Sequence, residues 1–311
     1  MNKKNQPREN ITNSQGEFSE IVTQRRCKLP NNMEIAYQTK VEAEYFYKDI
    51  FEKQIYLRHG ITLKDGDCVF DVGGNIGLFT LFVHQQQKNI TVYTFEPAPI
   101  LFEIMRFNIS RNGFNAKLFN CGLSNQTKTA TFTFYLKNSG MSSFYADVKE
   151  EKKVLRTIML NQLNQRRQGI TGMEQVMQDA DDLIDELLED RFESETYTCQ
   201  LRTLSDVIAE YHVEQIDLLK IDVQKSEWDI ITGIKENDWH KIKQIVLEVH
   251  DIEGRLNQIL ILLQQHEYQV FVEQDDMCEG SNLYNLFAIK NHLDVSLVDQ
   301  ILTQDKLEPG V

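Results

Sequence analysis

A glycine-containing loop that opens with an acidic residue lies between an apolar run and a helical pattern. It reads Asp71-Val72-Gly73-Gly74-Asn75-Ile76-Gly77 and follows Cys68-Val69-Phe70. Glycines let a backbone approach a ligand closely, and the N-terminus of a following helix presents N–H groups. The loop therefore predicts a bound nucleotide-like cofactor. The candidate contacts are Asp71, Gly73, Asn75 and Gly77.

The glycine spacing distinguishes two classes of cofactor. A dinucleotide loop requires Gly-x-Gly-x-x-Gly. If Gly74 and Gly77 are taken as the second and third glycines of this pattern, the first glycine position holds Val72. If Gly73 is taken as the first glycine, the second and third positions hold Asn75 and Leu78. Neither register fits. An acidic residue at the start of the loop instead suits a ligand with an ammonium group, which the methionine part of S-adenosylmethionine supplies.

Two segments further along the chain extend this cofactor site. Glu96, in Phe95-Glu96-Pro97, follows a second strand pattern about 20 residues beyond the loop, where an acidic side chain accepts hydrogen bonds from both ribose hydroxyls. Asn120-Cys121-Gly122-Leu123 follows a third strand pattern, where the edge of the adenine would lie. We therefore add Glu96, Pro97, Asn120 and Leu123 as candidate cofactor residues.

Polar residues at the ends of two later strands provide candidates for catalysis. Ligands of open parallel sheets lie beyond the carboxyl ends of the strands, and Asp222, Glu248 and His250 fall at such ends. An alcohol acceptor needs a base, and imidazole titrates near neutrality, so His250 is the candidate base. A structural histidine is the alternative. Glu248 is costly to bury without a partner or a ligand. We expect Asp222 to contact the cofactor rather than to act as base.

The candidate substrate residues are more scattered in the sequence. Ser142 and Ser143 stand in Gly140-Met141-Ser142-Ser143-Phe144, and Tyr47 stands in an aromatic-rich helix that could form a lid or simply face the core. Glu227 follows the strand that ends at Asp222. No cluster of acidic, histidine or cysteine residues has the spacing of metal ligands, so we expect no metal site.

The elements that position these residues alternate between strands and helices. Strands are predicted at 68–72, 91–95, 116–119, 216–222 and 243–249, with helices at 77–85, 99–112, 203 onward, 226–234 and 252–266. This alternation predicts βαβ units and a parallel sheet. A lid helix is expected at 41–57, an antiparallel or edge strand at 129–135, an extended segment at 196–201, and a closing pair of strands at 268–273 and 284–290.

Three boundaries follow from these patterns. Residues 1–30 are polar and are expected to be loosely ordered. Residues 31–290 form one catalytic domain, with a helical insertion at about 148–192 that is either a substrate-closing cap or a solvated excursion. The acidic group from Asp179 to Asp185 is expected to be a solvated helix face. Residues 291–311 form a tail, or a linker to further domains.

Composition restricts the partners and the cellular location. The formal net charge of −14 disfavours nucleic acid and anionic membranes. The five cysteines form no close pair, which argues against disulfides or zinc and fits a reducing cytoplasm. The sequence shows no signal peptide pattern and no apolar run of membrane-spanning length.

The motifs together resemble the FkbM-type methyltransferases. Those that carry the resemblance are Val69–Gly77, Phe95-Glu96-Pro97, Lys220-Ile221-Asp222-Val223 and Leu247-Glu248-Val249-His250. The resemblance implies a class I methyltransferase fold: a mostly parallel, seven-stranded, Rossmann-like α/β sheet with helices on both faces. It also implies S-adenosylmethionine as cofactor, S-adenosylhomocysteine as product, and O-methylation of polyketides, peptides or sugars, sometimes within a larger biosynthetic enzyme.

One departure from the family concerns the segment after the fourth main strand. The family often has Asp-Val-Glu-Gly there, whereas this chain has Asp222-Val223-Gln224-Lys225, which leaves the substrate contacts open. The leading hypothesis is an O-methyltransferase for a hydroxyl or carboxyl of a natural-product intermediate, free, peptidic or carrier-bound. The alternatives are an NAD-dependent oxidoreductase on the same sheet and a silent docking module. The sequence indicates neither the acceptor nor the oligomeric state.

Overall fold

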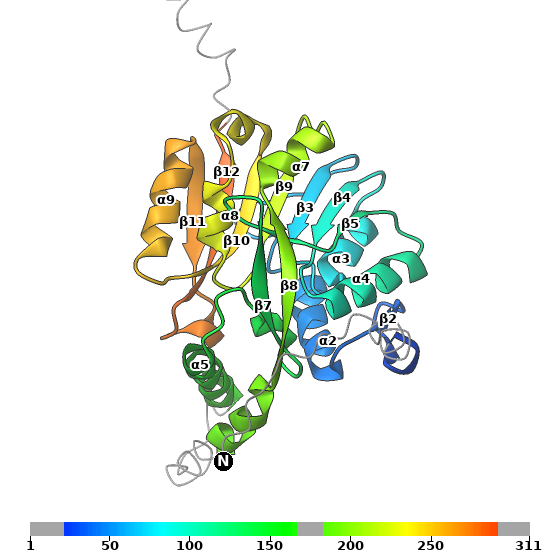
Figure 1. The fold of residues 1–311 in the computed structure, drawn as a ribbon, viewed down its shortest axis with the longest axis vertical. Helices are drawn as coiled ribbons and strands as arrows, with labels where there is room; N and C mark the ends of the chain where they lie inside the picture. Colours follow the sequence, from blue (N-terminus) through cyan, green and yellow to red (C-terminus); the bar gives the residue numbers. More distant parts are fainter. Residues whose placement is uncertain (1–21, 167–182, 292–311) are drawn as a thin grey trace, which may run out of the picture.

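A seven-stranded sheet forms the centre of the computed structural model, which describes residues 22–166 and 183–291. Its strand order is β11-β12-β10-β9-β3-β4-β5 (Figure 1). Strand β12 pairs antiparallel with both of its neighbours, and the other pairs are parallel. The mostly parallel sheet expected from the sequence is thereby confirmed. The strands are β3 (Cys68–Val72), β4 (Thr91–Phe95), β5 (Lys117–Phe119), β9 (Leu218–Ile221), β10 (Gln244–His250), β11 (Tyr268–Glu273) and β12 (Leu283–Lys290).

Alternate residues of the central strands face two hydrophobic cores. Val69 and Val92 pack into the core that contains helices α3 and α4, while Phe70 and Tyr93 pack into the core that contains α7, α8 and α9. Burial on both faces explains why these strands are continuous apolar runs rather than alternating ones. The sheet thus lies between two helical layers. The helices are α3 (Leu78–Gln86), α4 (Pro99–Arg111), α7 (Leu204–Glu210), α8 (Glu227–Thr232) and α9 (Arg255–Gln265).

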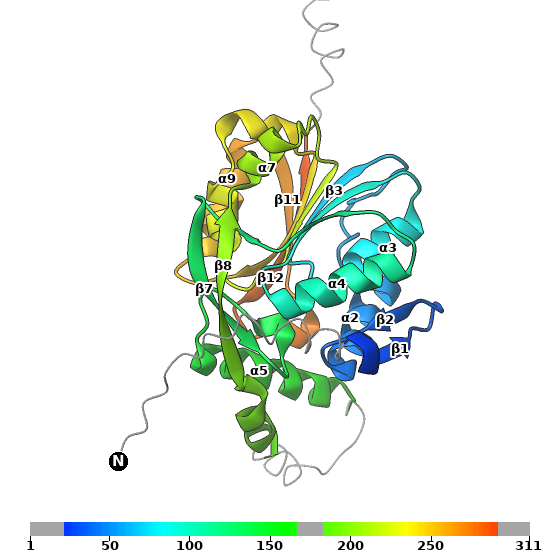
Figure 2. The ribbon, with the colours of Figure 1, turned by 45° about the vertical axis from the view of Figure 1, so that its right-hand side comes forward.

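A second sheet carries the helical insertion. Strands β6 (Gly122–Leu123), β8 (Ser194–Arg202) and β7 (Lys128–Tyr135) pair in the order β6-β8-β7. Strands β7 and β8 form an antiparallel ribbon from Lys128↔Leu201 to Tyr135↔Ser194. Figures 1 and 2 show this ribbon running from the main sheet towards helix α5 (Val148–Arg166). The predicted antiparallel strand therefore pairs outside the main sheet.

The insertion is helical, as expected, over the residues that the structure describes. Helix α5 leads into it, and residues 183–189 are helical before the 3-10 turn η3 (Asp190–Phe192) returns the chain to β8. Asp185 lies on this second helix and pairs with Arg156 of α5 at 3.1 Å. The rest of the predicted acidic group, Asp179, Asp181 and Asp182, lies outside the described residues.

The N-terminal region differs from the sequence-based expectation in two ways. A hairpin of β1 (Arg26–Lys28) and β2 (Glu34–Ala36) begins inside the segment expected to be loose, while residues 1–21 lie outside the description. The expected helix 41–57 is shorter, with α2 (Lys40–Tyr47) continuing into a π-helical turn, η1 (Lys48–Glu52). Thr39 caps α2 by accepting a hydrogen bond from the backbone N–H of Glu42.

Short helical turns complete the description. They are η2 (Ser139–Met141), η4 (Glu236–Lys241) and η5 (Asp276–Cys278). Across the two described ranges, none of the helices combines the length and the apolar character needed to cross a bilayer.

Candidate active site

A cavity of about 410 Å³ opens at the carboxyl ends of strands β3, β4, β9 and β10. Its wall includes most of the candidate residues from these strand ends, namely Gly73, Asn75, Glu96, Pro97, Asp222, Glu248 and His250, together with Leu123 of β6. Elements outside the main sheet close the other sides, namely α2, η1, η2 and α5. The structure therefore brings sequence segments more than 170 residues apart to one cavity, at the edge where ligands of open parallel sheets bind.

The glycines of the loop after β3 are required by close packing. A Cβ on Gly73, whose φ is +83°, would lie 1.8 Å from the carbonyl oxygen of Asp222. A Cβ on Gly74 would lie 2.4 Å from Thr94 Cγ2, and one on Gly77 would lie 3.0 Å from Met105 Cγ. Gly73 and Gly74 line the cavity, whereas Gly77 packs against α4 and does not.

The N–H groups of this loop are already hydrogen-bonded, contrary to the expectation that they are free for a ligand. Gly73 and Gly74 both donate to the carbonyl of Phe95, at 3.0 and 2.9 Å, and Gly77 donates to the carbonyl of Gly74. Asn75 donates to Glu96, and Ile76 donates to the Asn75 side chain. A pyrophosphate needs free donors at this position, so the loop does not suit a dinucleotide.

Asp71 lies behind the cavity wall. It is fully buried, with Oδ1 3.1 Å from Lys220 Nζ and Oδ2 accepting from Thr80 Oγ1 at 2.8 Å. Lys220 also donates to the carbonyl of Gly73 at 2.8 Å. Burial lowers the pKa of Lys220, but Asp71 and Asp222 outweigh it, so the net shift is upward and the ammonium is retained. Asp71 therefore supports the loop through Lys220, rather than meeting a ligand's ammonium group as we expected.

Glu96 lies on the cavity wall with its carboxylate held by the backbone. Oε2 accepts from Asn75 N at 2.8 Å, and Oε1 accepts from Ala98 N at 2.9 Å. Burial raises the pKa of Glu96 to about 8, although both backbone donors lower it. Each oxygen keeps a further lone pair, so the group can still accept hydrogen bonds from a diol.

Asn120 does not reach the cavity. Its side-chain amide donates to the carbonyl of Glu96 at 2.9 Å and to that of Pro97 at 3.3 Å, so it braces the turn between β4 and α4. The expected contact with adenine is therefore not supported at Asn120. Its neighbour Leu123 is buried and lines the cavity.

Two carboxylates lie at the adjacent ends of β9 and β10. Asp222 Oδ2 accepts from Tyr56 Oη at 2.7 Å, and Glu248 Oε1 accepts from Gln224 Nε2 at 3.0 Å. Burial, followed by the carboxylates of Asp222 and Glu227, raises the pKa of Glu248 well above its ordinary range. This wall of the cavity would favour a cationic group, because such a group would relieve the repulsion between the carboxylates.

His250 forms a buried pair with Glu227. The Nδ1 atom of His250 lies 3.1 Å from Glu227 Oε1, and that oxygen also accepts from the backbone N–H of Lys225 at 2.8 Å. His250 lines the cavity, whereas Glu227 lies behind it, fully buried. Glu227 was expected at the substrate but instead orients the His250 ring. The pair has the geometry of a general base and its orienting carboxylate.

Of the remaining candidate substrate residues, one lines the cavity and two are buried away from its wall. Ser142 lines the cavity, and its hydroxyl oxygen accepts from the backbone N–H of Tyr135 at 3.0 Å. Ser143 is buried off the wall and donates to the carbonyl of Gln224 at 2.6 Å. Tyr47 is also off the wall, because it stacks on Phe51 with ring centroids 4.8 Å apart. Its neighbours Tyr45 and Phe46 line the cavity instead.

No group of three or more possible metal ligands occurs within residues 22–166 and 183–291. The chain matches the model of the methyltransferase FkbM domain over residues 71–270. It is also 39% identical over 271 residues to the 31-O-demethyl-FK506 methyltransferase FkbM of Streptomyces tacrolimicus, covering 87% of this chain and 98% of that relative.

The chain belongs to the FkbM methyltransferase family.

Two further similarities differ in extent. The chain is 37% identical over 280 residues to the AMB antimetabolite synthetase AmbE of Pseudomonas aeruginosa, covering 88% of this chain but 13% of that protein. The crystal structure of methyltransferase FkbM from Methylobacillus flagellatus KT shares 14% identity at a TM-score of 0.44, covering 75% of this chain and 46% of that one. Family membership therefore rests on the sequence matches.

Several residues of this FkbM-type site were not among the sequence candidates. Lys220 and Tyr56 hold the carboxylates of Asp71 and Asp222, and both line the cavity. A lysine within the apolar run of β9 was a visible signal, because a charged residue is buried only with partners. Arg191 and Asn138 also line the cavity, but no comparable pattern marks them in the sequence, because Arg191 lies in the turn η3 and Asn138 directly precedes η2.

Proposed function

We propose that this FkbM-family methyltransferase uses S-adenosylmethionine to methylate an oxygen, the hydroxyl or carboxyl of a natural-product intermediate. Bound in the cavity, that cofactor would supply an electrophilic methyl group. The observation that carries the proposal is the His250–Glu227 pair, which lines the cavity at the carboxyl end of β10.

The cavity wall fits the proposed cofactor. Glu96 would accept hydrogen bonds from the ribose hydroxyls, since it lines the cavity and its position is fixed by Asn75 and Ala98. Asp222 and Glu248 would favour an ammonium group at their end of the cavity. Gly73 keeps the loop tight against β9, and Leu123 and Pro97 supply apolar wall. The saturated N–H groups of the loop favour this cofactor over NAD.

His250 would remove the proton from a hydroxyl acceptor. Its Nδ1 is held by Glu227, which fixes the ring and stabilises the imidazolium that forms when the other ring nitrogen takes a proton. Glu248 is a second candidate catalytic group at the same strand end, able to hold or release a proton as the local charge changes. A carboxylate acceptor would need neither step.

The names of relatives support the choice of acceptor. The Streptomyces relative is named for O-methylation of an FK506 precursor, which is a natural-product intermediate. The match to a small part of a synthetase supports a setting in which the acceptor is peptidic or carrier-bound. The chain would then act on its own or as one part of a longer biosynthetic enzyme.

Calorimetry and mass spectrometry test the proposal together. S-adenosylhomocysteine should bind the wild-type chain while NAD should not. A pathway intermediate with a free hydroxyl should gain the mass of one methyl group when S-adenosylmethionine is present. NAD binding without S-adenosylhomocysteine binding would refute the assignment. Cofactor binding with no turnover on any acceptor would indicate a silent docking module.

A further inference from the structure

Seven carboxylate, lysine or arginine side chains line the cavity, and two of them are cations. The five carboxylates are Glu42, Asp49, Glu96, Asp222 and Glu248, and the cations are Lys220 and Arg191. Lys220 is neutralised by Asp71 and lies 3.9 Å from Asp222. The other lining cation is Arg191.

Arg191 makes no hydrogen bond or ion pair with any residue in the described parts of the chain, although it is half-buried. The lining carboxylates are all engaged elsewhere. Glu42 accepts from Gly140 N and Thr39 Oγ1, and Asp49 pairs with Lys53 at 2.7 Å. Glu96 accepts from the backbone N–H of Asn75, Asp222 accepts from Tyr56, and Glu248 accepts from Gln224.

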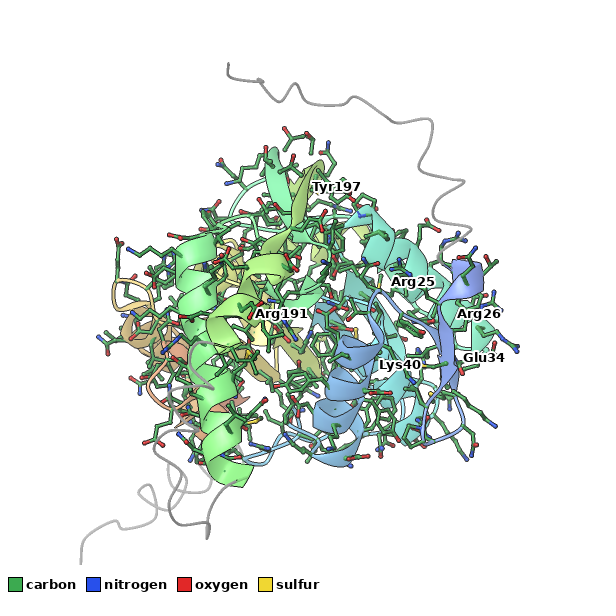
Figure 3. The ribbon with its side chains drawn as sticks, turned by 90° about the horizontal axis from the view of Figure 1, so that it is seen from below. Arg25, Arg26, Glu34, Lys40, Arg191 and Tyr197 are labelled. Carbon is green, nitrogen blue, oxygen red and sulfur yellow. The ribbon has the colours of Figure 1, made fainter. Side chains whose placement is uncertain are left out.

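The backbone that carries Arg191 is fixed by its neighbour. Phe192 is buried and meets the ring of Tyr135 edge-on at a centroid distance of 5.0 Å. Tyr135 also donates from its hydroxyl to Glu151 of α5 at 3.0 Å. Viewed from below, Arg191 lies between helix α5 and helix α2 (Figure 3). The Arg191 backbone is thus fixed on the side of the cavity that α2 and α5 close, opposite the sheet.

The walls on either side of Arg191 are mostly apolar. Helix α5 contributes Leu155, Ile158 and Met159, and helix α2 contributes Val41, Tyr45 and Phe46. Val41 and Tyr45 remain 69% and 42% exposed, so much of their apolar surface is open to a ligand. One more polar group is unsatisfied here. Asn138 is buried and lines the cavity, and its Nδ2 has no partner.

We propose that Arg191 binds an anionic group of the methyl acceptor, a carboxylate or a phosphate ester, while the α2 and α5 walls hold an apolar body. This inference rests on the proposed function and narrows its substrate class. A planar guanidinium matches carboxylate and phosphate oxygens in a two-bond fork. An unpaired, half-buried cation is costly, so an anionic ligand gains from neutralising it. The Asn138 amide provides a second donor in the same cavity.

Matched pairs of small probes test the inference on protein saturated with S-adenosylhomocysteine. The carboxylate arm compares 10-hydroxydecanoate with 1,10-decanediol, and the phosphate arm compares 4′-phosphopantetheine with pantetheine. Calorimetry should show that at least one anionic probe binds tenfold or more tightly than its neutral partner. The arm with the larger ratio identifies the source of the anion. In Arg191→Gln, the preference should fall to within twofold, while Arg191→Lys should keep part of it.

Arg156→Gln is the matched control, because it removes an arginine from α5 that does not line the cavity. It should keep the wild-type preference. Equal affinity within both pairs for the wild type, including no binding by any probe, would overturn the inference, as would a preference that survives in Arg191→Gln. Affinity for S-adenosylhomocysteine is measured separately on each variant. If the wild type does not bind S-adenosylhomocysteine, the proposed function is contradicted, whatever the probes show on the cofactor-free protein.

Discussion

At the scale of single residues, the site depends on buried charges that hold one another in place. Lys220 connects Asp71, the carbonyl of Gly73 and the region of Asp222, and Tyr56 donates to Asp222 from the other side. Burial, reinforced by the Asp222 carboxylate, raises the pKa of Tyr56 well above its ordinary value, so its hydroxyl remains a donor. A buried pair of this kind positions ligand contacts rather than adding much stability.

Removing the Glu96 carboxylate should weaken cofactor binding directly. We expect Glu96→Ala to reduce the affinity for S-adenosylhomocysteine by tenfold or more, about 1.4 kcal/mol, because a diol acceptor is lost. Calorimetry at pH 7 measures this. Glu103→Ala, which removes a surface carboxylate on α4 that pairs with Arg106, is the control and should bind normally. Wild-type affinity in Glu96→Ala would remove Glu96 from the site.

Asp71 should act through a different route, although we expect a loss of similar size. Asp71→Ala leaves Lys220 buried beside Gly73 without its main counter-ion. The loop should shift, and binding of S-adenosylhomocysteine should weaken tenfold or more. The free energy of unfolding should also fall, by about 3 kcal/mol, because the carboxylate supports the fold and leaves a buried cation unpaired when it is removed. Urea unfolding without ligand checks this second effect, and unchanged stability would contradict the supporting role.

His250 should govern turnover rather than cofactor binding. With a hydroxyl acceptor, His250→Ala should lower the rate by about 10²- to 10⁴-fold, the usual range for loss of a general base. Affinity for S-adenosylhomocysteine should persist. Glu227→Gln should give a smaller loss, because the ring keeps a partner but the imidazolium is less stabilised. Wild-type turnover in His250→Ala would eliminate the base and favour a carboxylate acceptor.

At the scale of elements, a buried ion pair joins the insertion to the loop after β9. Lys225 Nζ lies 2.6 Å from Glu151 Oε1, with side chains 9% and 2% exposed, and so joins the loop after β9 to helix α5. Lys225 stands where the family often has glycine, and its φ is +71°. A lysine in that conformation is strained, which a glycine would avoid. The departure noted in the sequence therefore connects the insertion to the site.

Breaking this contact should release helix α5 from the loop. We expect Lys225→Met to increase hydrogen exchange in α5 at least tenfold, with little change in the main sheet, because Glu151 is left buried without its counter-ion. Lys152→Met is the matched control, since Lys152 pairs with the 74% exposed Glu189. The double variant Lys225→Met with Glu151→Leu should recover much of the lost protection. Unchanged exchange in Lys225→Met would show that the pair does not hold the insertion.

At the scale of the whole molecule, the buried carboxylates make stability depend on pH. Burial raises the pKa of Glu96 from 4.5 to about 8 in the folded protein, so between these values the folded state binds more protons than the unfolded state. Stability from this group is therefore present below about pH 4.5 and is lost as pH rises towards 8. Glu248 shifts in the same direction.

The free energy of unfolding should consequently fall between pH 6 and pH 8 in the absence of ligand. The slope from Glu96 is at most about 1.4 kcal/mol per pH unit. Glu96→Gln cannot titrate and should have a shallower slope, which urea unfolding at pH 6, 7 and 8 would measure. Saturating S-adenosylhomocysteine should also reduce the wild-type slope, since hydroxyl donors favour the ionised carboxylate. Identical slopes in the two proteins would contradict the burial of an ionisable Glu96.

Much of the fold was predictable from local pattern. The apolar runs that become β3, β4, β9 and β10 and the spacing of the helices between them predicted a parallel sheet. The helix predicted from residue 203 onward is α7, which Thr203 caps. Such patterns are local because burial on both faces needs only a continuous apolar segment. The hairpin β1–β2 and the π-turn η1 were missed, because three-residue strands and a single irregular turn leave no periodicity to detect.

The sequence by itself determined the family and the strand ends at which Glu96, Asp222, Glu248 and His250 lie. Order along parallel strands fixes which residues come to the carboxyl edge. Only the tertiary structure decided which of the candidates face the cavity. Asp71 pairs with Lys220, Asn120 donates to the β4–α4 turn, and Glu227 pairs with His250, because each partner is supplied by another segment of the chain. The placement of Arg191 opposite the sheet was likewise decided by the packing of Phe192 on Tyr135.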